Sequence, residues 1–434
     1  MQPVVRRAPE TLIDLADVHD RFPDRYPHLL ASAPAPGRYD ILFAYPKAAR
    51  VLQPGAGAHE RRAFFASLDT PDSPQPACAQ GLGLPFLYGH FLYFGYELAG
   101  AFEPRLRLPR PATPLAFAQE SLGALIRDHG ARQTYVTAAR ADIADAIEQD
   151  LGAVREDRSR GSVWDIEEED DRVFRARMRA IQEFILAGDI FQANLSRGYE
   201  ARTNARPAAL LKALMRHNPA PFAALASLGA HTIISASPER LVRTEGARIL
   251  TQPIAGTCPR ALEADADGAA RAALCADPKE RAEHIMLVDL ERNDLGRLCV
   301  EGSVQVTSLM AVESYASVHH LVSRIEGRLR PDTSLESVIA SLFPGGSITG
   351  CPKQRCIAIL GELEREARGP YTGSLGYRNQ AGDLDLNILI RTLVLAGQRL
   401  TWRAGAGIVA DSQIERELAE TRAKAAGLVG ALTA

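Results

Sequence analysis

Residues Thr232–Arg243 carry the sequence TIISASPERLVR, in which two apolar runs lie on either side of a Ser-Pro-Glu turn. Short runs of β-branched and aliphatic residues bounded by turn residues are typical of strands. With the apolar run Phe222–Ala226 just before it, the stretch predicts neighbouring strands of a sheet. Glu239 lies in the turn. A partly buried carboxyl there would have a raised pKa and could donate a proton, although an ion pair with Arg240 or a turn cap would explain the same residue.

Helical and strand patterns alternate through the rest of the chain. Phe174, Met178, Ile181 and Ile185 recur at helical spacing, and Gly188 follows as a stop signal. Further helices are expected at 280–290, at 335–342 with a capping-box spacing of Thr333 and Glu336, and at 413–432; further strands are expected at 371–377, 384–395 and 400–406. These patterns predict an α+β protein with a large sheet content.

Two breaks in composition suggest how the chain is divided. Loops rich in Pro, Gly and Ala interrupt residues 1–150, and a stretch with charges of both signs separates them from the rest. We therefore expect an N-terminal region at 1–150, a linker at 151–172 and a catalytic region at 173–434. The charge run Glu167–Asp171 is expected to be a solvated linker and helix start rather than a metal site.

The chain has 434 residues, 46% of them hydrophobic and 24% charged, with a formal net charge of -3. This composition fits a globular protein with a large core and lacks the basic field with which nucleic-acid binders displace counterions. The six cysteines form neither a C-x-x-C pair nor a zinc spacing, so reduced thiols are expected. The first residues lack a signal-peptide core, and no apolar run is long enough to span a membrane. We expect a cytoplasmic protein without nucleic-acid or membrane partners.

Three glutamates form a candidate site for a hard cation. Glu417 and Glu420 are spaced i, i+3 in a predicted helix and project from one face, and Glu283 lies in another predicted helix. Mg2+ takes carboxylate oxygens and waters and shares its remaining positions with an anionic substrate. The spacing alone is explained as well by a solvated helix face.

A glycine-rich turn at residues 345–353, GGSITGCPK, precedes a predicted helix that begins at Pro352 and runs to about residue 365. Backbone N–H groups at such a helix start bind anions. The spacing departs from the phosphate-binding G-x-x-x-x-G-K-[ST] loop, so a carboxylate suits this turn better than a phosphate. Farther along the chain, Arg391 could grip a carboxylate with two parallel hydrogen bonds, or could form a structural ion pair.

Several separate motifs occur here in the order in which one enzyme family carries them. They are Ile233–Arg240, Gln252–Thr257, Ala282–Leu290, Gly346–Gly350 and Gly407–Ser412. As a set they resemble the chorismate-utilising enzymes, which include the large subunits of anthranilate synthase and aminodeoxychorismate synthase. The resemblance covers nearly the whole chain and is densest from about residue 189 to 427. It implies two large, mostly antiparallel sheets packed as a sandwich with helices outside, the active site lying in the C-terminal region.

The resemblance also implies a metal and an acid. Glutamates at the positions of Glu283 and Glu420 hold Mg2+ in the family, and the metal grips the ring carboxylate of chorismate. Glu417 matches a further acid beside them. The residue at the position of Glu239 is assigned to assist departure of the 4-hydroxyl.

Adjacent histidines such as His319 and His320 do not face one metal site on a helix or a strand. By resemblance His320 lies near the leaving 4-hydroxyl and His319 is structural, and Thr257 belongs to the catalytic set. The residues implied to hold the pyruvyl group of chorismate are Gly346, Ser347, Thr349, Tyr377, Arg391 and Lys424, and Gly407 is implied to contact the substrate. For Lys424 a plain surface position is the alternative.

Gln192 bears on the incoming nucleophile. Family branches that add water carry a lysine here as general base, and a glutamine cannot take that proton. The resemblance therefore implies ammonia, although a hydrogen-bonding role at a strand edge would also suit a glutamine. Because the sequence shows no glutaminase domain with a cysteine nucleophile elbow, we expect ammonia from a separate glutamine amidotransferase subunit.

Ala255 lies where typical aminodeoxychorismate synthases carry a lysine that attacks the ring, and a methyl group can neither attack nor be protonated. On its own, Ala255 favours an anthranilate synthase, which adds ammonia and eliminates pyruvate. Arg38–Pro46 and Tyr93–Glu103 look more like the aminodeoxychorismate branch, and Leu29–Ser32 lacks the glutamate of the tryptophan-feedback signature. We therefore expect an aminodeoxychorismate synthase of 4-aminobenzoate and folate biosynthesis, with anthranilate synthase as the alternative and an inactive regulatory paralogue as a remote third.

Overall fold

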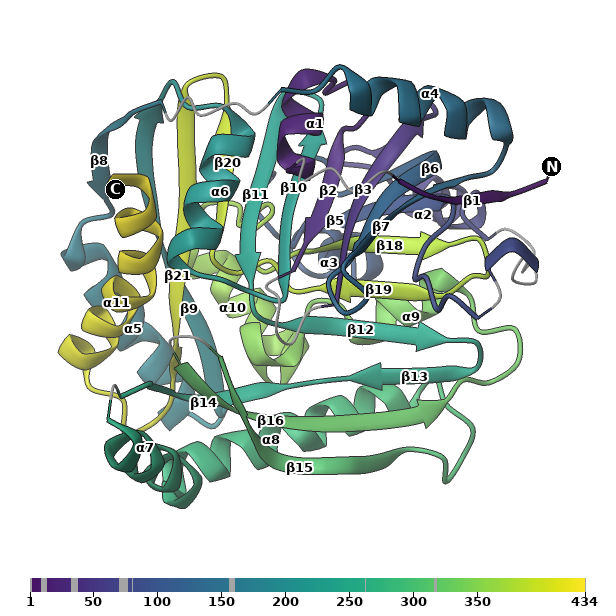
Figure 1. Cartoon of the computed structure of the whole chain (residues 1–434). Helices are drawn as coiled ribbons and strands as arrows, with labels where there is room; N and C mark the ends of the chain where they lie inside the picture. The colour runs from purple at the N-terminus through teal and green to yellow at the C-terminus, as the bar shows by residue number, and fades with distance from the viewer. Residues whose placement is uncertain are drawn as a thin grey trace.

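The computed structural model describes residues 2–8, 14–32, 38–69, 77–79, 81–155, 161–261, 263–315 and 318–433. Figure 1 shows long strands through the middle of the molecule and helices around them.

One long strand, β6 (Ala116–Asp128), organises the sheet. It pairs in antiparallel fashion with several strands at once, the earlier part of β6 on β4 and β5 and the later part on β3 and β7. These neighbours are β3 (Tyr39–Pro46), β4 (Arg50–Leu52), β5 (Gly89–Phe94) and β7 (Gln133–Ala138), and β1 (Val4–Arg7) follows beside β7. Because β6 is shared, the sheet branches there into two arms.

The first arm leaves β6 through β3. It continues in pairing order through β2 (His28–Ala31), β10 (Phe222–Leu228), β11 (His231–Ser237), β20 (Thr392–Ala396), β21 (Arg399–Ile408) and β9 (Gln192–Thr203), with β8 (Val163–Glu168) and β17 (Gly350–Cys351) beside β9. The second arm leaves through β5. It continues through β18 (Ser374–Asn379), β19 (Leu384–Asn387), β12 (Arg240–Glu245), β13 (Arg248–Thr251) and β16 (Val318–Arg328), with β14 (Ile254–Pro259) and β15 (Gln305–Ser314) beside β16.

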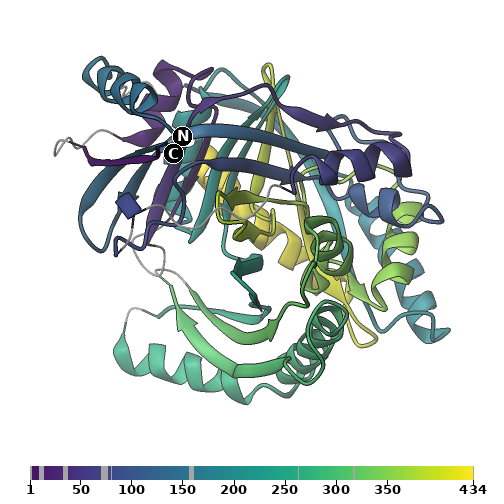
Figure 2. The same ribbon diagram turned by 90° about the vertical axis from the view of Figure 1, so that its right-hand side faces the viewer.

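The expected α+β fold with large antiparallel layers is confirmed, with one refinement. The two layers are arms of one connected sheet in the described residues rather than separate sheets. In Figure 2 the green strands of the second arm curve below the purple and blue strands of the N-terminal part. The strands expected at 222–226, 232–235 and 240–243 are β10, β11 and β12. Since β11 belongs to the first arm and β12 to the second, the Ser-Pro-Glu turn joins the two arms.

Helices cover the arms. The helices are α1 (Leu15–Arg21), α2 (Ala58–Ala66), α3 (Leu98–Phe102), α4 (Ala141–Gly152), α5 (Asp171–Leu186), α6 (Pro207–His217), α7 (Ala264–Ala276), α8 (Pro278–Gly296), α9 (Leu335–Leu342), α10 (Lys353–Glu364) and α11 (Ile414–Thr433). The apolar face of α5 buries Phe174, Met178 and Ile181 against β9, as the helical spacing predicts. The helices α5 and α11 lie together over the first arm, and α8 packs on β14 and β16 of the second (Figure 1).

Three local expectations need correction. The segment expected as one strand at 384–395 is split into β19 and β20, because the backbone turns at Arg391, whose φ of 50° lies in the left-handed region. The strand expected from residue 371 begins only at Ser374. Helix α9 has the expected bounds, but its N-cap is Ser334, whose hydroxyl accepts from Ser337 N, and not Thr333.

The stretch expected as a linker holds ordered secondary structure where it is described. Within it, β8 pairs with β9, and Asp171 opens α5. The fully buried Arg197 guanidinium donates to Asp171 at 2.9 Å, and Arg422 reaches the same carboxylate at 2.8 Å. The expected division into regions at 1–150, 151–172 and 173–434 stays a prediction.

None of the helices in the described ranges is long and apolar enough to cross a membrane.

Candidate active site

Glu239 lies in the turn between the two arms and is buried, with 4% of its surface exposed. The Ser347 hydroxyl, from the short helical turn Gly346–Ile348, donates to Glu239 Oε1 at 2.6 Å. Burial raises the pKa of Glu239 to about 7, against the lowering effects of Ser347, the backbone at Ile254 and the charge of Lys424. The carboxyl is therefore about half protonated at neutral pH, and its role as a proton donor stays a prediction.

The glycine-rich turn is shaped by close packing. A Cβ added at Gly346 would lie 2.6 Å from Leu290 of α8, so only glycine fits there. The Thr349 hydroxyl donates to Gly345 O at 2.9 Å and is used within the turn itself. Pro352 is the N-cap of α10 rather than its first residue, a shift of one position from the expectation. Of the hydroxyls in this turn, Ser347 is the one that reaches the acid.

His320 and Thr257 face each other across β16 and β14. Thr257 Oγ1 lies 2.7 Å from His320 Nδ1, and the strand register pairs the two residues. Burial and, after it, the positive charge of Arg391 lower the pKa of His320 to about 4, so the ring is neutral at pH 7. The preceding His319 contacts the Ser314 hydroxyl at 2.7 Å and Asp267 at 3.0 Å on the other face of β16.

Arg391 stands out because nothing in the described part of the chain binds its guanidinium by a hydrogen bond or an ion pair. Its left-handed backbone, uncommon for a residue with a Cβ, lies between β19 and β20 and directs the chain away from the sheet ladder. Burial lowers the pKa of Arg391, and its charge acts on His320. The chemistry of a guanidinium without a partner among the described residues allows it to bind a carboxylate through two parallel hydrogen bonds.

Gln192 opens β9 and is buried beside Glu283 of α8. Its Nε2 donates to Glu283 Oε1 at 2.7 Å, and its own Oε1 has no hydrogen-bond partner among the described residues. A Cβ added at Gly407 of β21 would lie 2.7 Å from Gln192 Nε2. Gly407 therefore makes room for the pair.

Acidic side chains gather where α8 and α11 approach each other. Burial raises the pKa of Glu280, and the charges of Glu283 and Glu420 raise it further. Burial likewise raises the pKa of Glu417, with Glu420 adding to the rise. Glu280 is a member that the sequence reasoning missed, although its i, i+3 spacing to Glu283 repeats that of Glu417 and Glu420.

The fourth acid, Glu420, is engaged by a lysine. Lys424 Nζ lies 2.7 Å from Glu420 Oε1 and also donates to Gly405 O of β21 at 3.0 Å. Across the part of the chain that the structure describes, no three His, Cys, Asp or Glu side chains converge closely enough to hold a metal as they stand. The acids are thus neighbours that repel one another rather than a formed cage.

Ala255 lies in β14 on the same wall as Thr257. It is buried, and its carbonyl lies 3.2 Å from Nδ1 of His284, whose Nε2 contacts the Ser323 hydroxyl at 2.6 Å. The methyl group supplies no nucleophile at this position, as the sequence indicates.

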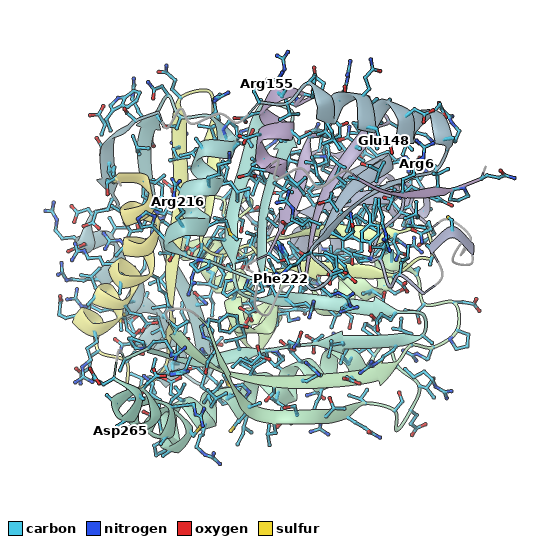
Figure 3. The ribbon with its side chains drawn as sticks, viewed as in Figure 1. Arg6, Glu148, Arg155, Arg216, Phe222 and Asp265 are labelled. Carbon is cyan, nitrogen blue, oxygen red and sulfur yellow. The ribbon has the colours of Figure 1, made fainter. Side chains whose placement is uncertain are left out.

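Tyr377 is the one predicted site residue that the structure places apart. Its ring packs edge-on against Phe86, and the charges that act on its pKa are those of Asp385, Arg243, Arg240 and Asp383. It lines a cavity of about 740 Å3 whose lining lacks Glu239, His320 and Arg391. Phe222, labelled near the centre of Figure 3, lines the same cavity beneath the Arg240 guanidinium.

A different tyrosine lies nearer the cluster. A Cβ at Gly405 would lie 2.6 Å from the Tyr371 hydroxyl, and Gly405 O is the group that accepts from Lys424. Burial raises the pKa of Tyr371 to about 12. Tyr371 was expected to open a strand but lies in the turn before β18, and its place beside Gly405 has no signal in the sequence.

The remaining predicted residues come together from both arms. Gln192 and Gly407 belong to the first arm, Thr257 and His320 to the second, and Arg391 and Glu239 to turns that join the two arms. The arrangement offers an acid with a raised pKa, a neutral histidine, a guanidinium without a partner among the described residues, and the carboxylates of α8 and α11. It can bind a dianion, protonate a leaving hydroxyl and admit a neutral nucleophile.

Comparison with known proteins gives consistent matches. A family model described as chorismate binding enzyme matches residues 27–430. An anthranilate synthase component I-like protein of a Synechocystis species is 37% identical over 416 residues, covering 94% of this chain and 84% of the relative. An anthranilate synthase component 1 of Haloarcula marismortui is 48% identical over 259 residues, which is 60% of this chain and 53% of the relative.

Two further matches bear on activity and fold. An aminodeoxychorismate synthase of Streptomyces griseus is 38% identical over 367 residues, covering 80% of this chain and 50% of the relative. The chain therefore spans about half the length of some of its curated relatives. The crystal structure of anthranilate synthase component I from Streptococcus pneumoniae superposes with a TM-score of 0.80 at 30% identity, covering 91% of this chain and 92% of that one.

Proposed function

The chain belongs to the family of chorismate-binding enzymes, and from that premise we propose that it is the large subunit of an aminodeoxychorismate synthase. The reaction is chorismate plus ammonia to 4-amino-4-deoxychorismate plus water. Two observations support the aminodeoxychorismate branch. Arg38–Pro46 and Tyr93–Glu103 resemble the sequences of that branch. The match to the Streptomyces aminodeoxychorismate synthase, at 38% identity, covers 80% of this chain.

The observation that supports ammonia rather than water as the nucleophile is the contact between Gln192 and Glu283. A glutamine whose Nε2 is held at 2.7 Å by a carboxylate cannot act as the base that a water nucleophile needs. Its free Oε1 is a hydrogen-bond acceptor, which suits the N–H groups of ammonia. Ammonia is already a nucleophile and needs no base to attack.

Different side chains are proposed to bind the substrate and to transfer the proton. The unpaired Arg391 guanidinium grips a carboxylate of chorismate, and the turn at 346–349 supplies backbone N–H groups to the same end. Glu239 gives its proton to the 4-hydroxyl, which leaves as water, while Ser347 holds the carboxyl in place. Neutral His320, oriented by Thr257, hydrogen-bonds the departing oxygen.

The acidic group at α8 and α11 fits a Mg2+ ion in its chemistry. Carboxylate oxygens are the preferred ligands of this ion, and mutual repulsion among Glu280, Glu283 and Glu420 is relieved by a cation. Glu283 and Glu420 would hold it, with Glu280 and Glu417 beside them and Lys424 released from Glu420. When bound, Mg2+ supplies positive charge that neutralises the ring carboxylate of the substrate.

Ala255 bears on whether a covalent enzyme intermediate forms. Because its methyl group cannot attack the ring, we propose that turnover proceeds without a covalent enzyme intermediate. Trapping a substrate adduct on any other side chain during turnover would contradict this. The same residue is the observation that favours the second candidate, an anthranilate synthase that makes anthranilate and pyruvate from chorismate.

The nitrogen source in this proposal is a separate glutamine amidotransferase subunit. The proposal rests on the anthranilate synthase and aminodeoxychorismate synthase relatives and on Gln192, which suits ammonia and not water. Free ammonium at high pH replaces that subunit in an assay.

A product assay separates the candidates. The chain is incubated with chorismate, Mg2+ and ammonium at high pH. We expect a non-fluorescent product that an added aminodeoxychorismate lyase converts to 4-aminobenzoate. Fluorescent anthranilate without the lyase would assign the tryptophan-type reaction instead, and no turnover would assign a binding or regulatory role.

A substitution tests the proposed metal. Glu420→Gln removes a charge from the acidic group, so activity is expected to be lost, with partial recovery at raised Mg2+ concentration. Arg416→Gln, an exposed position on the same helix, is the matched control. Wild-type rates in Glu420→Gln would remove Glu420 from the metal site.

A further inference from the structure

Asn194 is a polar residue in the wall of the site that the proposed mechanism does not use. It follows Gln192 by two positions in β9, so the two side chains point to the same face of the sheet. Its Oδ1 is buried and, like Gln192 Oε1, has no hydrogen-bond partner among the described residues. Because a buried acceptor without a partner costs free energy, a ligand that donates hydrogen bonds would stabilise both oxygens.

The contacts of the two amides fix which end of each is free. Asn194 Nδ2 donates to Ser347 O at 3.4 Å, and Gln192 Nε2 donates to Glu283 Oε1 at 2.7 Å. With either amide reversed, its oxygen would face a carbonyl or carboxylate oxygen, which has no proton to donate. The free ends are therefore both acceptors, and they suit a ligand with N–H groups rather than a carboxylate.

The neighbouring strand β21 leaves room for these two amides. A Cβ added at Gly405 would lie 2.6 Å from Asn194 Oδ1, and a Cβ added at Gly407 would lie 2.7 Å from Gln192 Nε2. Gly407 is also the residue that pairs with Asn194 across the two strands. The backbone of Asn194 is fixed from the other side, because Arg368 Nη2 donates to Asn194 O at 2.6 Å. Asn194 Oδ1 is thus a rigidly placed acceptor over a strip of glycines.

The two free oxygens belong to different sides of the site. Ser347, which accepts from Asn194 through its carbonyl, donates through its hydroxyl to Glu239, the proposed acid for the 4-hydroxyl. Gln192 is turned instead to Glu283, among the acids that the proposed function puts near the ring carboxylate. In chorismate C4 bears the hydroxyl, and C2 is next to the carbon that bears the ring carboxylate. Asn194 therefore lies toward C4, and Gln192 toward C2.

We propose that Asn194 determines which ring carbon receives the nitrogen, by holding ammonia on the Glu239 side of the site. The proton of Glu239 goes to the 4-hydroxyl, the C4–O bond breaks and water leaves, so that positive charge spreads over C4, C6 and C2. The lone pair of ammonia then forms the C–N bond at C4. The Glu239 carboxylate takes the extra proton of the new ammonium group and is again protonated. This inference rests on the proposed function and names the residue that sets its product.

The test is a pair of variants with side chains of the same shape. Asn194→Val removes the acceptor oxygen, and Asn194→Thr keeps an oxygen and is the matched control. Wild type and both variants are incubated with chorismate, Mg2+ and ammonium at high pH, and the 4-amino and 2-amino products are separated by liquid chromatography. We expect the ratio of 4-amino to 2-amino product to fall on the order of tenfold in Asn194→Val, as for the loss of one hydrogen bond. In Asn194→Thr the ratio is expected to stay near that of the wild type, with KM for chorismate unchanged in both variants.

Equal product ratios in the wild type and Asn194→Val would overturn the inference. So would a raised KM for chorismate with an unchanged ratio, which would show that Asn194 binds the substrate itself. If the valine variant does not fold, Asn194→Ala and Asn194→Ser make the same comparison. The wild-type product tests the proposed function separately. A wild type that makes only the 2-amino product would overturn that function together with the inference, whereas a 4-amino product that the variants leave unaffected would overturn the inference alone.

Discussion

Two arginines, the buried Arg368 and the half-buried Arg391, show how differently the molecule treats its charges. Arg368 is bound on every side: its guanidinium donates to both oxygens of Glu364 at 2.7 and 2.8 Å, to Asn194 O at 2.6 Å and to Ile348 O at 3.2 Å. Among the described residues Arg391 has no such partner, and burial lowers its pKa. A charge that the fold satisfies supports the structure, while a charge that the fold leaves open awaits a ligand.

The largest expected effect is a loss of stability when Arg368, the arginine with protein partners, is replaced. Arg368→Met leaves Glu364 charged and buried, so the free energy of unfolding in urea is expected to fall by about 3–5 kcal/mol. The control is Arg399→Met, whose pair with Glu200 is exposed and is worth less than about 1 kcal/mol. A loss as small as that of the control would show that the Glu364–Arg368 pair is not needed for the fold.

For Arg391 the expected effect is on the binding of chorismate. Arg391→Met removes a charged donor to the substrate carboxylate, so KM for chorismate is expected to rise roughly 10- to 100-fold, corresponding to about 1.5–3 kcal/mol. The free energy of unfolding is expected to stay the same or to increase slightly, because a half-buried charge without a partner among the described residues disappears. A clear loss of stability with unchanged KM would identify Arg391 as a structural ion-pair residue instead.

The smallest expected effect is a change in pH dependence. The folded pKa of Glu239 is raised to about 7 from 4.5, so its contribution to stability is fully present below about pH 4.5 and is lost as the pH rises through 7. Glu364, whose pKa is lowered to about 2, contributes above about pH 4.5 and loses its contribution toward pH 2. Glu239→Gln is expected to flatten the decline in unfolding free energy between about pH 4.5 and pH 7 by up to about 1.4 kcal/mol per pH unit.

Urea titrations from pH 2 to 9 measure this slope. The decline below pH 4.5 serves as the internal control, because Glu364 remains in the variant. An unchanged slope between pH 4.5 and 7 would mean that Glu239 is not the group whose burial matters there.

Part of the site was predictable from the sequence because it depends on local pattern. The strand-turn-strand pattern placed Glu239 between β11 and β12, and helical spacing placed Glu417 and Glu420 on one face of α11. Glu280 was accessible by the same spacing rule. The fold class followed from the density of strand patterns and from the family motifs.

The rest depends on contacts between distant segments. Ser347 meets Glu239 only because the glycine-rich turn folds back onto the turn between the arms. Strand alternation did not distinguish Tyr371 from Tyr377, because β18 begins between them. Arg391 was expected inside a strand, and its positive φ, which breaks that strand, has no signature in an apolar run.

The branching of the sheet at β6 has a consequence for how the chain reaches its native state. Glu97 accepts from Arg368 N across 271 residues of sequence, and β5 pairs with β18 over a similar span. Contacts of such high sequence separation close large loops before they gain stability, which makes folding slow. Neither arm can complete its ladder until the segments at both ends of the chain have been synthesised, so a nascent chain exposes strand edges that are prone to aggregate.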